Sequence, residues 1–234
     1  MWIRQMHNRC RLRAPALRYV LSDLLLLRAL PASGFTIVLL GKVGALVTRP
    51  RASDGLSLPA AAYVLQQGFA VLFLGVVVAL FVARRPTTGR RSSLRGGLVA
   101  LVGTFILSVP VAAPVSEHQT AVLLVSSALV LIGTGFAITS LLALGRCFGV
   151  MPEARGLVTR GPYRWIRHPI YLGEIVSALG LVIGAFTWPM LGLFVVFFGL
   201  QYWRAMLEED ALEEAFPEYA EYRKHTYRLL PLVH

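Results

Sequence analysis

The feature that most constrains this chain is a series of apolar runs long enough to cross a lipid bilayer. A spanning helix needs about 20 predominantly apolar residues, and four runs reach or nearly reach that length, at 19–47, 60–83, 97–114 and 120–145. A fifth run, 170–203, is interrupted by a Trp-Pro pair, which predicts a helical hairpin because proline ends a helix. The sequence therefore predicts an all-α, polytopic transmembrane protein with about six crossings.

Composition and charge agree with a membrane location. Hydrophobic residues make up 56% of the 234 residues and the mean hydropathy is +0.64, more than a soluble domain of this length needs. The net charge is +11, but Lys and Arg occupy short segments between apolar runs and form no basic face interleaved with aromatics, so we expect no nucleic-acid partner. Cys10 and Cys147 lack metal-ligand spacing, and we expect neither a disulfide nor a metal site.

The arginines predict the orientation, because cytoplasmic loops carry the excess of basic residues. Arginine-rich ends fall at 1–18, 84–95 and 146–169, whereas 115–119 has none and 48–59 has only two. We therefore expect a multi-pass protein with both termini cytoplasmic, in which the N-terminus is a signal anchor and no cleavable signal peptide is present. The bias toward Ala, Leu, Val and Arg favours a bacterial inner membrane.

Polar residues are concentrated in two segments, 156–173 and 204–222, which bracket the hairpin. A hairpin returns its chain to the same side of the membrane, so the two segments should meet at the cytoplasmic surface. The side chains expected to meet there are Arg167, His168, Tyr171, Arg204, Glu208 and Glu209. We accordingly divide the chain into N-terminal transmembrane helices, 1–150, and a C-terminal part, 151–234, that ends in a cytoplasmic helical tail.

The spacing of the polar residues predicts a pocket at the cytoplasmic surface but does not indicate which reaction takes place there. Arg204 and Glu208 are four residues apart and share a helix face, so they can pair or bind one ligand together. Pro169 suits the first turn of a helix. Without other information, His168, Arg164 and Arg167 with Tyr163 and Trp165 are better explained as a belt of aromatic and basic membrane anchors. Arg204 with Glu208 is likewise better explained as an ordinary surface ion pair.

One arrangement resembles a known family. The segment Gly161-Pro-Tyr-Arg-Trp-Ile-Arg-His-Pro-Ile-Tyr-Leu-Gly173, a hydrophobic hairpin and then Glu208-Glu209 is similar to the isoprenylcysteine carboxyl methyltransferase and phospholipid methyltransferase superfamily of integral membrane methyltransferases. The resemblance covers 156–231. It implies transfer of a methyl group from S-adenosylmethionine to a lipophilic acceptor, either a prenylated carboxylate or a lipid headgroup. The first 150 residues would then form the access route for the acceptor.

The resemblance also implies roles for single residues. Arg204 and Glu208 would be catalytic: Arg204 would orient a carboxylate acceptor through its planar fork, and Glu208 would be the base for an amine or thiol. One of the two adjacent glutamates, Glu208 or Glu209, would bind the cofactor. The implied cofactor-binding residues are Leu157, Gly161, Pro162, Tyr163, His168, Tyr171, Leu172, Gly173, Glu208, Glu209 and Tyr219.

Two alternatives remain from the sequence. An NADPH-dependent sterol-type membrane reductase has a similar Arg-His-Pro-x-Tyr-x-Gly stretch, although such enzymes are longer and the acidic tail argues against one. A non-enzymatic membrane scaffold with the same fold is the second alternative. Phe216-Pro217-Glu218 departs from the Phe-Gly of the family and is expected to shift the turn before Tyr219.

Overall fold

A computed structural model of the protein describes residues 30–48, 58–85, 94–106, 120–151 and 153–229. Over these residues the chain is helical and has no β-strand, only an isolated bridge between Ile166 and Tyr227. The predicted all-α class is therefore confirmed. The predicted N-terminal basic end at 1–18, part of the basic loop at 84–95 and the last part of the predicted run 97–114 lie outside the described residues.

The helices match most of the predicted apolar runs. They are α2 (Leu30–Thr48), α3 (Leu58–Ala83), α4 (Leu94–Phe105), α5 (Thr120–Leu144), α6 (Pro169–Gly184), α7 (Trp188–Ala215) and α8 (Tyr219–Lys224), with short 3₁₀ turns η4 (Gly145–Cys147) and η5 (Gly161–Arg164).

Three helical segments, Leu58–Ala83, Thr120–Cys147 and Trp188–Ala215, are long and apolar enough to cross a membrane, and two shorter helices, Pro31–Val47 and Pro169–Gly184, are apolar as well. Together they make this an integral membrane protein. The number of crossings stays a prediction.

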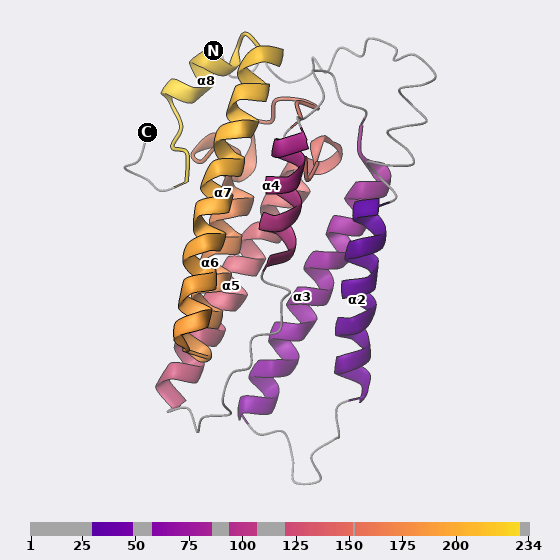
Figure 1. Ribbon diagram of the computed structural model, residues 1–234, viewed down its shortest axis with the longest axis vertical. Helices are drawn as coiled ribbons and strands as arrows, with labels where there is room; N and C mark the ends of the chain where they lie inside the picture. The colour runs from indigo at the N-terminus through magenta and orange to yellow at the C-terminus, as the bar shows by residue number, and fades with distance from the viewer. Residues whose placement is uncertain (1–29, 49–57, 86–93, 107–119, 152, 230–234) are drawn as a thin grey trace.

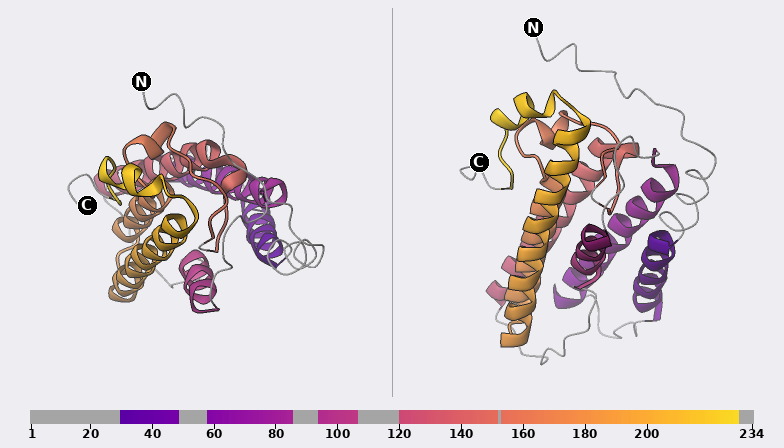
Figure 2. Two further views of the ribbon diagram at one scale, coloured as in Figure 1. Left: turned by 90° about the horizontal axis from the view of Figure 1, so that it is seen from above. Right: turned by 45° about the horizontal axis from the view of Figure 1, so that its top comes forward.

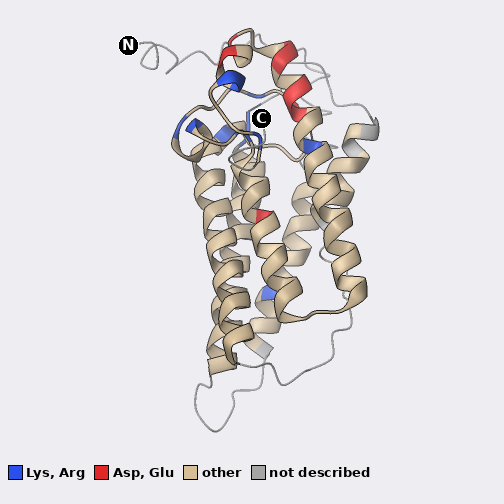
Figure 3. Ribbon diagram, turned by 90° about the vertical axis from the view of Figure 1, so that its left-hand side faces the viewer, with Lys and Arg blue, Asp and Glu red and all other residues tan. Residues whose placement is uncertain are grey.

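The long helices run side by side, and the shorter α4 lies on one side of the bundle that they form (Figure 1). Seen from above, α7, α6, α5, α3 and α2 follow an arc, and α4 stands at the open side of that arc (Figure 2). Acidic and basic residues gather at the end of the bundle that carries α8, and the helices below are almost free of charge (Figure 3). The charged end is therefore the expected location of a polar site.

Small residues allow α5 and α6 to approach closely. A Cβ atom placed on Gly173 would lie 2.6 Å from the carbonyl oxygen of Gly133 and 2.8 Å from the backbone nitrogen of Ala137, so only glycine fits at this crossing. Lower down, the Ser126 hydroxyl donates to the carbonyl of Gly180 at 2.9 Å. This close packing fixes the start of α6, and with it His168 and Tyr171, against the rest of the bundle.

The predicted hairpin is formed by α6 and α7. The Trp188-Pro189 pair lies in the first turn of α7, where the side chain of Thr187 accepts a hydrogen bond from the backbone nitrogen of Met190 at 3.2 Å. Proline therefore starts the second helix of the hairpin, since its missing donor is not needed there. No break separates the apolar part of α7 from the charged segment that begins at 204, so the tail continues the same helix.

A short segment after α8 returns to the start of the hairpin. The backbone nitrogen of Arg167 donates to the carbonyl of Tyr227 at 2.7 Å, and that of Tyr227 donates to the carbonyl of Trp165 at 2.9 Å. These bonds hold the C-terminal part of the described chain beside the residues that precede α6. Both polar segments predicted from the sequence thus meet at one end of the bundle.

Candidate functional site

The site is built around a buried carboxylate, that of Glu209 on α7. Its Oε1 accepts from Arg167 Nε at 2.9 Å and from Arg228 Nε at 3.0 Å, and its Oε2 accepts from Arg228 Nη2 at 2.9 Å. The side chains of Arg167 and Glu209 are 2% and 3% exposed. Buried charges are tolerated when they are paired and hydrogen-bonded in this way. Glu209 therefore ties α7, the segment before α6 and the C-terminal return segment together.

His168 lies between the two adjacent glutamates of α7. It caps the N-terminus of α6, with Nε2 at 3.2 Å from Glu209 Oε1 and Nδ1 at 3.6 Å from Glu208 Oε2. Burial by itself lowers the pKa of His168, but hydrogen bonds to Glu208 and Glu209 outweigh burial and raise the pKa above its usual value. Two facing carboxylates favour the imidazolium, because only the charged ring donates from both nitrogens.

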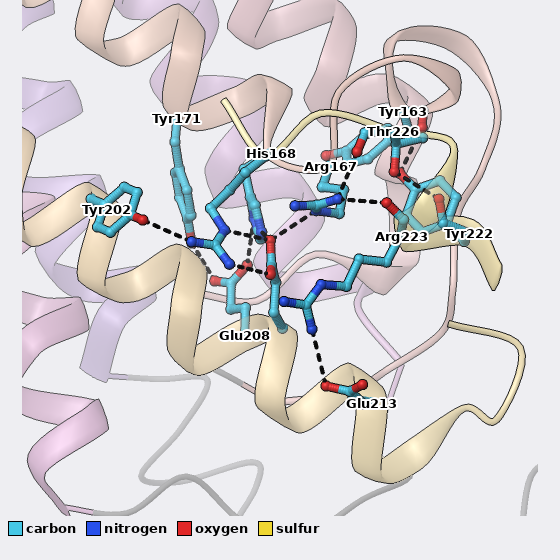
Figure 4. Close-up of polar contacts among 12 residues, drawn as sticks. Tyr163, Arg167, His168, Tyr171, Tyr202, Glu208, Glu213, Tyr222, Arg223 and Thr226 are labelled. Atoms are coloured by element: carbon cyan, nitrogen blue, oxygen red, sulfur yellow. Dashed lines mark hydrogen bonds and ion pairs between the residues drawn. The ribbon is translucent and has the colours of Figure 1, made fainter. Parts of the chain in front are cut away.

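Tyr171 continues this row of side chains one turn into α6. Its ring is stacked on that of His168, with 5.5 Å between centroids and 3° between planes, and its hydroxyl donates to Glu208. Figure 4 shows His168, Tyr171 and Glu208 side by side, with Arg167 beyond them. Glu208 is 23% exposed, far more than Glu209. Of the two glutamates, Glu208 is thus the one with room for a ligand.

Arg204 lies one helical turn before Glu208 and is only 5% exposed. Its guanidinium covers the ring of Tyr171 at 4.7 Å, donates to Gln201 Oε1 at 2.9 Å and reaches the carbonyl of Val150 at 3.4 Å. Within the described part of the chain no carboxylate lies in ion-pair distance of it. The interpretation of Arg204 as half of a surface ion pair is therefore wrong, because its guanidinium is buried and its hydrogen bonds go to neutral groups.

Three tyrosines enclose the outer end of the site. The Tyr222 hydroxyl donates to the carbonyl of Tyr163 at 2.6 Å, and the rings of Tyr219 and Tyr222 lie 5.8 Å apart. Burial raises the pKa of each of the three hydroxyls, so all of them are neutral donors. The Tyr219 hydroxyl is buried and has no hydrogen-bond partner within the described residues.

A cavity of about 340 Å³ connects this polar end to the apolar interior. Its polar walls include Tyr163, His168, Tyr171, Arg204, Glu208 and Tyr219. Its apolar walls include Phe35 and Val38 of α2, Phe73, Leu74 and Val77 of α3, and Leu141 of α5. The volume lies within the range of about 300–1,000 Å³ that is usual for small-molecule sites. The cavity therefore has the shape and polarity for an amphipathic ligand or for two ligands end to end.

The structure separates the predicted site residues into two groups. Those that line the cavity are Leu157, Tyr163, His168, Tyr171, Arg204, Glu208 and Tyr219. Those outside its walls are Gly161, Pro162, Leu172, Gly173 and Glu209. Gly161 has a positive φ of 59° that opens the turn η5 before Tyr163, and Gly173 makes the α5–α6 crossing. These two glycines thus shape the backbone next to the cavity.

Several lining residues were not assigned a role from the sequence. Glu174 lines the cavity and accepts a hydrogen bond from Gln201, which in turn bonds to Arg204. Residues 148–151 and 153–158 also line the cavity in part and contribute a buried ion pair, in which Arg155 Nη2 lies 2.5 Å from Glu153 Oε2. A glutamate inside an apolar run was a usable signal for Glu174. Nothing in the local sequence distinguished Gln201 from other polar residues.

The fold and this cavity define an integral membrane protein with a ligand-sized cavity where its helices meet the polar end of the bundle. A family model described as phospholipid methyltransferase matches residues 121–219, which include the start of α6, the hairpin and the glutamate pair. Over this segment the chain is similar to the superfamily of integral membrane methyltransferases that contains the isoprenylcysteine carboxyl and phospholipid methyltransferases, in agreement with the resemblance of its sequence.

Individual relatives match the same part of the chain. The cobalt-zinc-cadmium resistance protein CzcN of Cupriavidus metallidurans is 37% identical over 76 residues, covering 32% of this chain and 35% of that protein. The protein-S-isoprenylcysteine O-methyltransferase of Schizosaccharomyces pombe is 35% identical over 85 residues, covering 33% of this chain and 34% of that protein. The chain thus matches about a third of the length of these curated relatives.

Among solved structures, the eukaryotic intramembrane Ras methyltransferase, an isoprenylcysteine carboxyl methyltransferase, is similar with a TM-score of 0.49 and 16% identity. The superposition covers 92% of this chain and 81% of that one.

Proposed function

We propose that this protein transfers a methyl group from S-adenosylmethionine to a lipophilic acceptor that lies in the membrane. The observation that carries the proposal is a cavity, polar at one end and apolar at the other, which lies largely within the region that matches the methyltransferase family. Methyl transfer needs donor and acceptor held in line and shielded from water, and a partly enclosed cavity between helices favours both conditions.

The polar end of the cavity fits S-adenosylmethionine by its chemistry. Arg167 Nη2 and the Tyr219 hydroxyl are buried there without partners among the described residues, so two donors are available to the carboxylate or ribose of the cofactor. The aromatic rings of Tyr163, Tyr171 and His168 offer faces to the adenine and to a positive sulfur. When bound, the cofactor supplies an electrophilic methyl group on that sulfur. The Glu208 carboxylate adds a negative charge that complements the positive sulfur of the cofactor.

Arg204 and Glu208 are the residues placed to act on the acceptor. Arg204 brings to the cavity a buried guanidinium that has no ion-pair partner among the described residues, and this planar group can bind a carboxylate or phosphate in two-point contact. For an acceptor amine or thiol, Glu208 would take the proton, and its bond from the Tyr171 hydroxyl fixes the carboxylate in position. The apolar walls on α2 and α3 would hold the lipid chain of the acceptor.

Ligand binding to the detergent-purified protein tests the proposal. We expect S-adenosylmethionine, and not NADPH, to raise the midpoint of thermal unfolding and to give a heat of binding in calorimetry. His168→Ala and Glu208→Gln should lose this binding without unfolding, whereas Glu213→Gln, which changes an exposed carboxylate, should keep it. Stabilisation by NADPH alone would favour the sterol-type reductase, and a response to neither would favour a scaffold.

We also propose that the charged end of the bundle faces the cytoplasm of a bacterium, with both chain termini on that side. The support is that basic residues gather at this end of the bundle (Figure 3) and that segment 146–169 of the sequence is rich in arginine, as expected for the cytoplasmic side. The test is cysteine labelling in intact cells with a membrane-impermeant reagent. Cysteine introduced in place of exposed Glu221 should react only after the cells are lysed, and reaction in intact cells would contradict the orientation.

A further inference from the structure

Lys42 is a charged residue inside the apolar helix α2. It is the only Asp, Glu, Lys or Arg of this helix. Its side chain is partly buried and lines the cavity together with those of Phe35 and Val38. The three residues are three and four positions apart, so they share one face of α2. A cation therefore faces the cavity on the side of the bundle opposite the helical hairpin of α6 and α7.

The other face of α2 is apolar and exposed. It carries Ile37, Leu40 and Val47, which are the residues expected to contact lipid. A helix advances by 100° per residue, which places Lys42 on the far side of the helix from these three side chains. Lys42 thus belongs to the inner face of α2, as is usual for charged residues of membrane helices.

The direction of the Lys42 side chain follows from the packing of α2 against α3. The ring of Phe35 lies 5.6 Å from that of Phe81, and the ring of Phe81 lies 5.4 Å from that of Phe148. Phe148 is two residues before the carbonyl that Arg204 reaches, so the N-terminal part of α2 is the part nearest the polar end. Helical side chains lean toward the N-terminus of their helix. The ammonium group of Lys42 therefore leans toward the polar end and away from the opposite membrane surface.

Lys42 has no partner in the part of the chain that the structure describes. Among these residues its ammonium group makes no hydrogen bond and no ion pair. Glu174 and Glu208 line the same cavity, but neither is within ion-pair distance of it. A lone ammonium group among apolar helices is costly, and such residues are usually paired or belong to a binding site. The partner that this arrangement leaves for Lys42 is an anion on a ligand.

We propose that Lys42 binds the phosphate of an anionic phospholipid from the surrounding membrane, in a second binding site on the α2 side of the cavity. This site is separate from the polar cluster of α6 and α7, to which the proposed function assigns the cofactor and the reacting groups. The phospholipid is held there as a bound component and is not the methyl acceptor.

The surroundings of Lys42 favour a lipid over a free anion. Lys42 is seven residues after Phe35, and Leu74 of the antiparallel helix α3 is seven residues before Phe81, so the two lie at the same level of the bundle. Leu74 and its neighbour Phe73 line the cavity and provide an apolar surface for the start of the acyl chains.

The charge of Lys42 favours a phospholipid with a net negative headgroup. An ammonium group is a point charge that binds phosphate without the planar fit of a guanidinium. Basic pockets between transmembrane helices bind anionic headgroups in this way. A zwitterionic phospholipid carries its own ammonium group, which competes with Lys42 for the phosphate. The site should therefore select net negative phospholipids.

Two phospholipids with identical acyl chains test this site. Phosphatidylglycerol has a net negative charge, whereas the phosphate of phosphatidylcholine is neutralised by its own choline group. The full-length protein, purified in a non-ionic detergent, is equilibrated with an equimolar mixture of the two. Native mass spectrometry then counts the copies of each lipid that stay bound to the wild type and to four variants, Lys42→Met, Lys42→Arg, Lys224→Met and Arg204→Leu.

We expect the wild type to retain one copy of phosphatidylglycerol with a preference of at least about tenfold over phosphatidylcholine, the effect of one contact to a charged group. Lys42→Met keeps most of the side-chain length without the charge and should lose this copy, whereas Lys42→Arg should retain it. Lys224→Met is the matched control and should retain it too, because the Lys224 side chain is 69% exposed and is the other lysine of the chain. Arg204→Leu should also retain it.

Three results would overturn the proposal: equal retention of the two lipids by the wild type, a preferred copy that survives Lys42→Met, or loss of that copy in Lys224→Met or Arg204→Leu. Displacement of the lipid by inorganic phosphate at the same concentration would overturn the lipid as the ligand. Circular dichroism checks that Lys42→Met is folded, and Lys42→Gln makes the same comparison if it is not. S-adenosylmethionine binding by the wild type reports separately on the proposed function.

Discussion

Replacing either of the two adjacent glutamates of α7, Glu208 or Glu209, with glutamine should have different effects on stability and on cofactor binding. Glu209→Gln removes a 3% exposed carboxylate that binds Arg167, Arg228 and His168, and it leaves the 2% exposed Arg167 without its ion-pair partner. Breaking a buried pair from one side costs about 3–5 kcal/mol. For a protein of this size that corresponds to a fall in the unfolding midpoint of roughly 10 °C.

Glu208→Gln should leave stability almost unchanged, within about 1 kcal/mol, because Gln still accepts the hydrogen bond from the neutral Tyr171 hydroxyl. It should instead weaken S-adenosylmethionine binding, since the lost carboxylate lines the cavity. The assay is thermal unfolding in detergent followed by circular dichroism, together with calorimetric titration of the cofactor. Equal destabilisation by the two variants, or an unchanged midpoint for Glu209→Gln, would refute the division of roles.

Three further outcomes follow from the geometry. The pKa of His168 is raised in the folded protein, so the stability that its charged form contributes is complete below the unfolded pKa of about 6.5 and is lost as the pH rises through the folded pKa. The free energy of unfolding should therefore fall above neutral pH in the wild type and fall less in His168→Gln. Urea unfolding at several pH values measures this difference. Gly173→Val should lower the unfolding midpoint, by overpacking worth about 1–3 kcal/mol, and Gly192→Val, in open space, should change it far less. Tyr222→Phe should cost about 0.5–1.5 kcal/mol, measured by the same unfolding, through the lost bond to the Tyr163 carbonyl.

The elements that bring the site together could be predicted because they depend on local signals. Apolar length predicts the spanning helices, and the Trp188-Pro189 pair predicts the hairpin, which returns the chain to the same end of the bundle. Once the hairpin is expected, the meeting of His168 with Glu208 follows from its geometry.

The internal arrangement of the site could not be read from the sequence, since it depends on contacts between distant residues. Glu208 and Glu209 are neighbours of the same type, and only their directions from α7 make one a cavity wall and the other a buried partner of three cations. The link between Glu174 and Arg204 through Gln201 requires the relative rotation of α6 and α7, which apolar periodicity does not specify.

The access route through the N-terminal helices was likewise expected only as a consequence of the resemblance. The structure places residues of α2 and α3 in the same cavity as the polar residues of α6 and α7. No motif in the N-terminal helices signals this, because any apolar face can line a lipid chain.

We propose that the protein transfers a methyl group to a lipophilic molecule in this cavity. S-adenosylmethionine labelled with tritium in the methyl group tests this transfer directly. Membranes that contain the protein are incubated with the label and extracted with organic solvent. Methyl transfer in this cavity predicts label in the extracted lipids with the wild type and with Glu213→Gln, and a loss of at least about 100-fold with Arg204→Leu, the effect of removing one electrostatic contact to the reacting group. Extracts of wild-type membranes with no more label than membranes lacking the protein, while the purified protein still binds the cofactor, would contradict it.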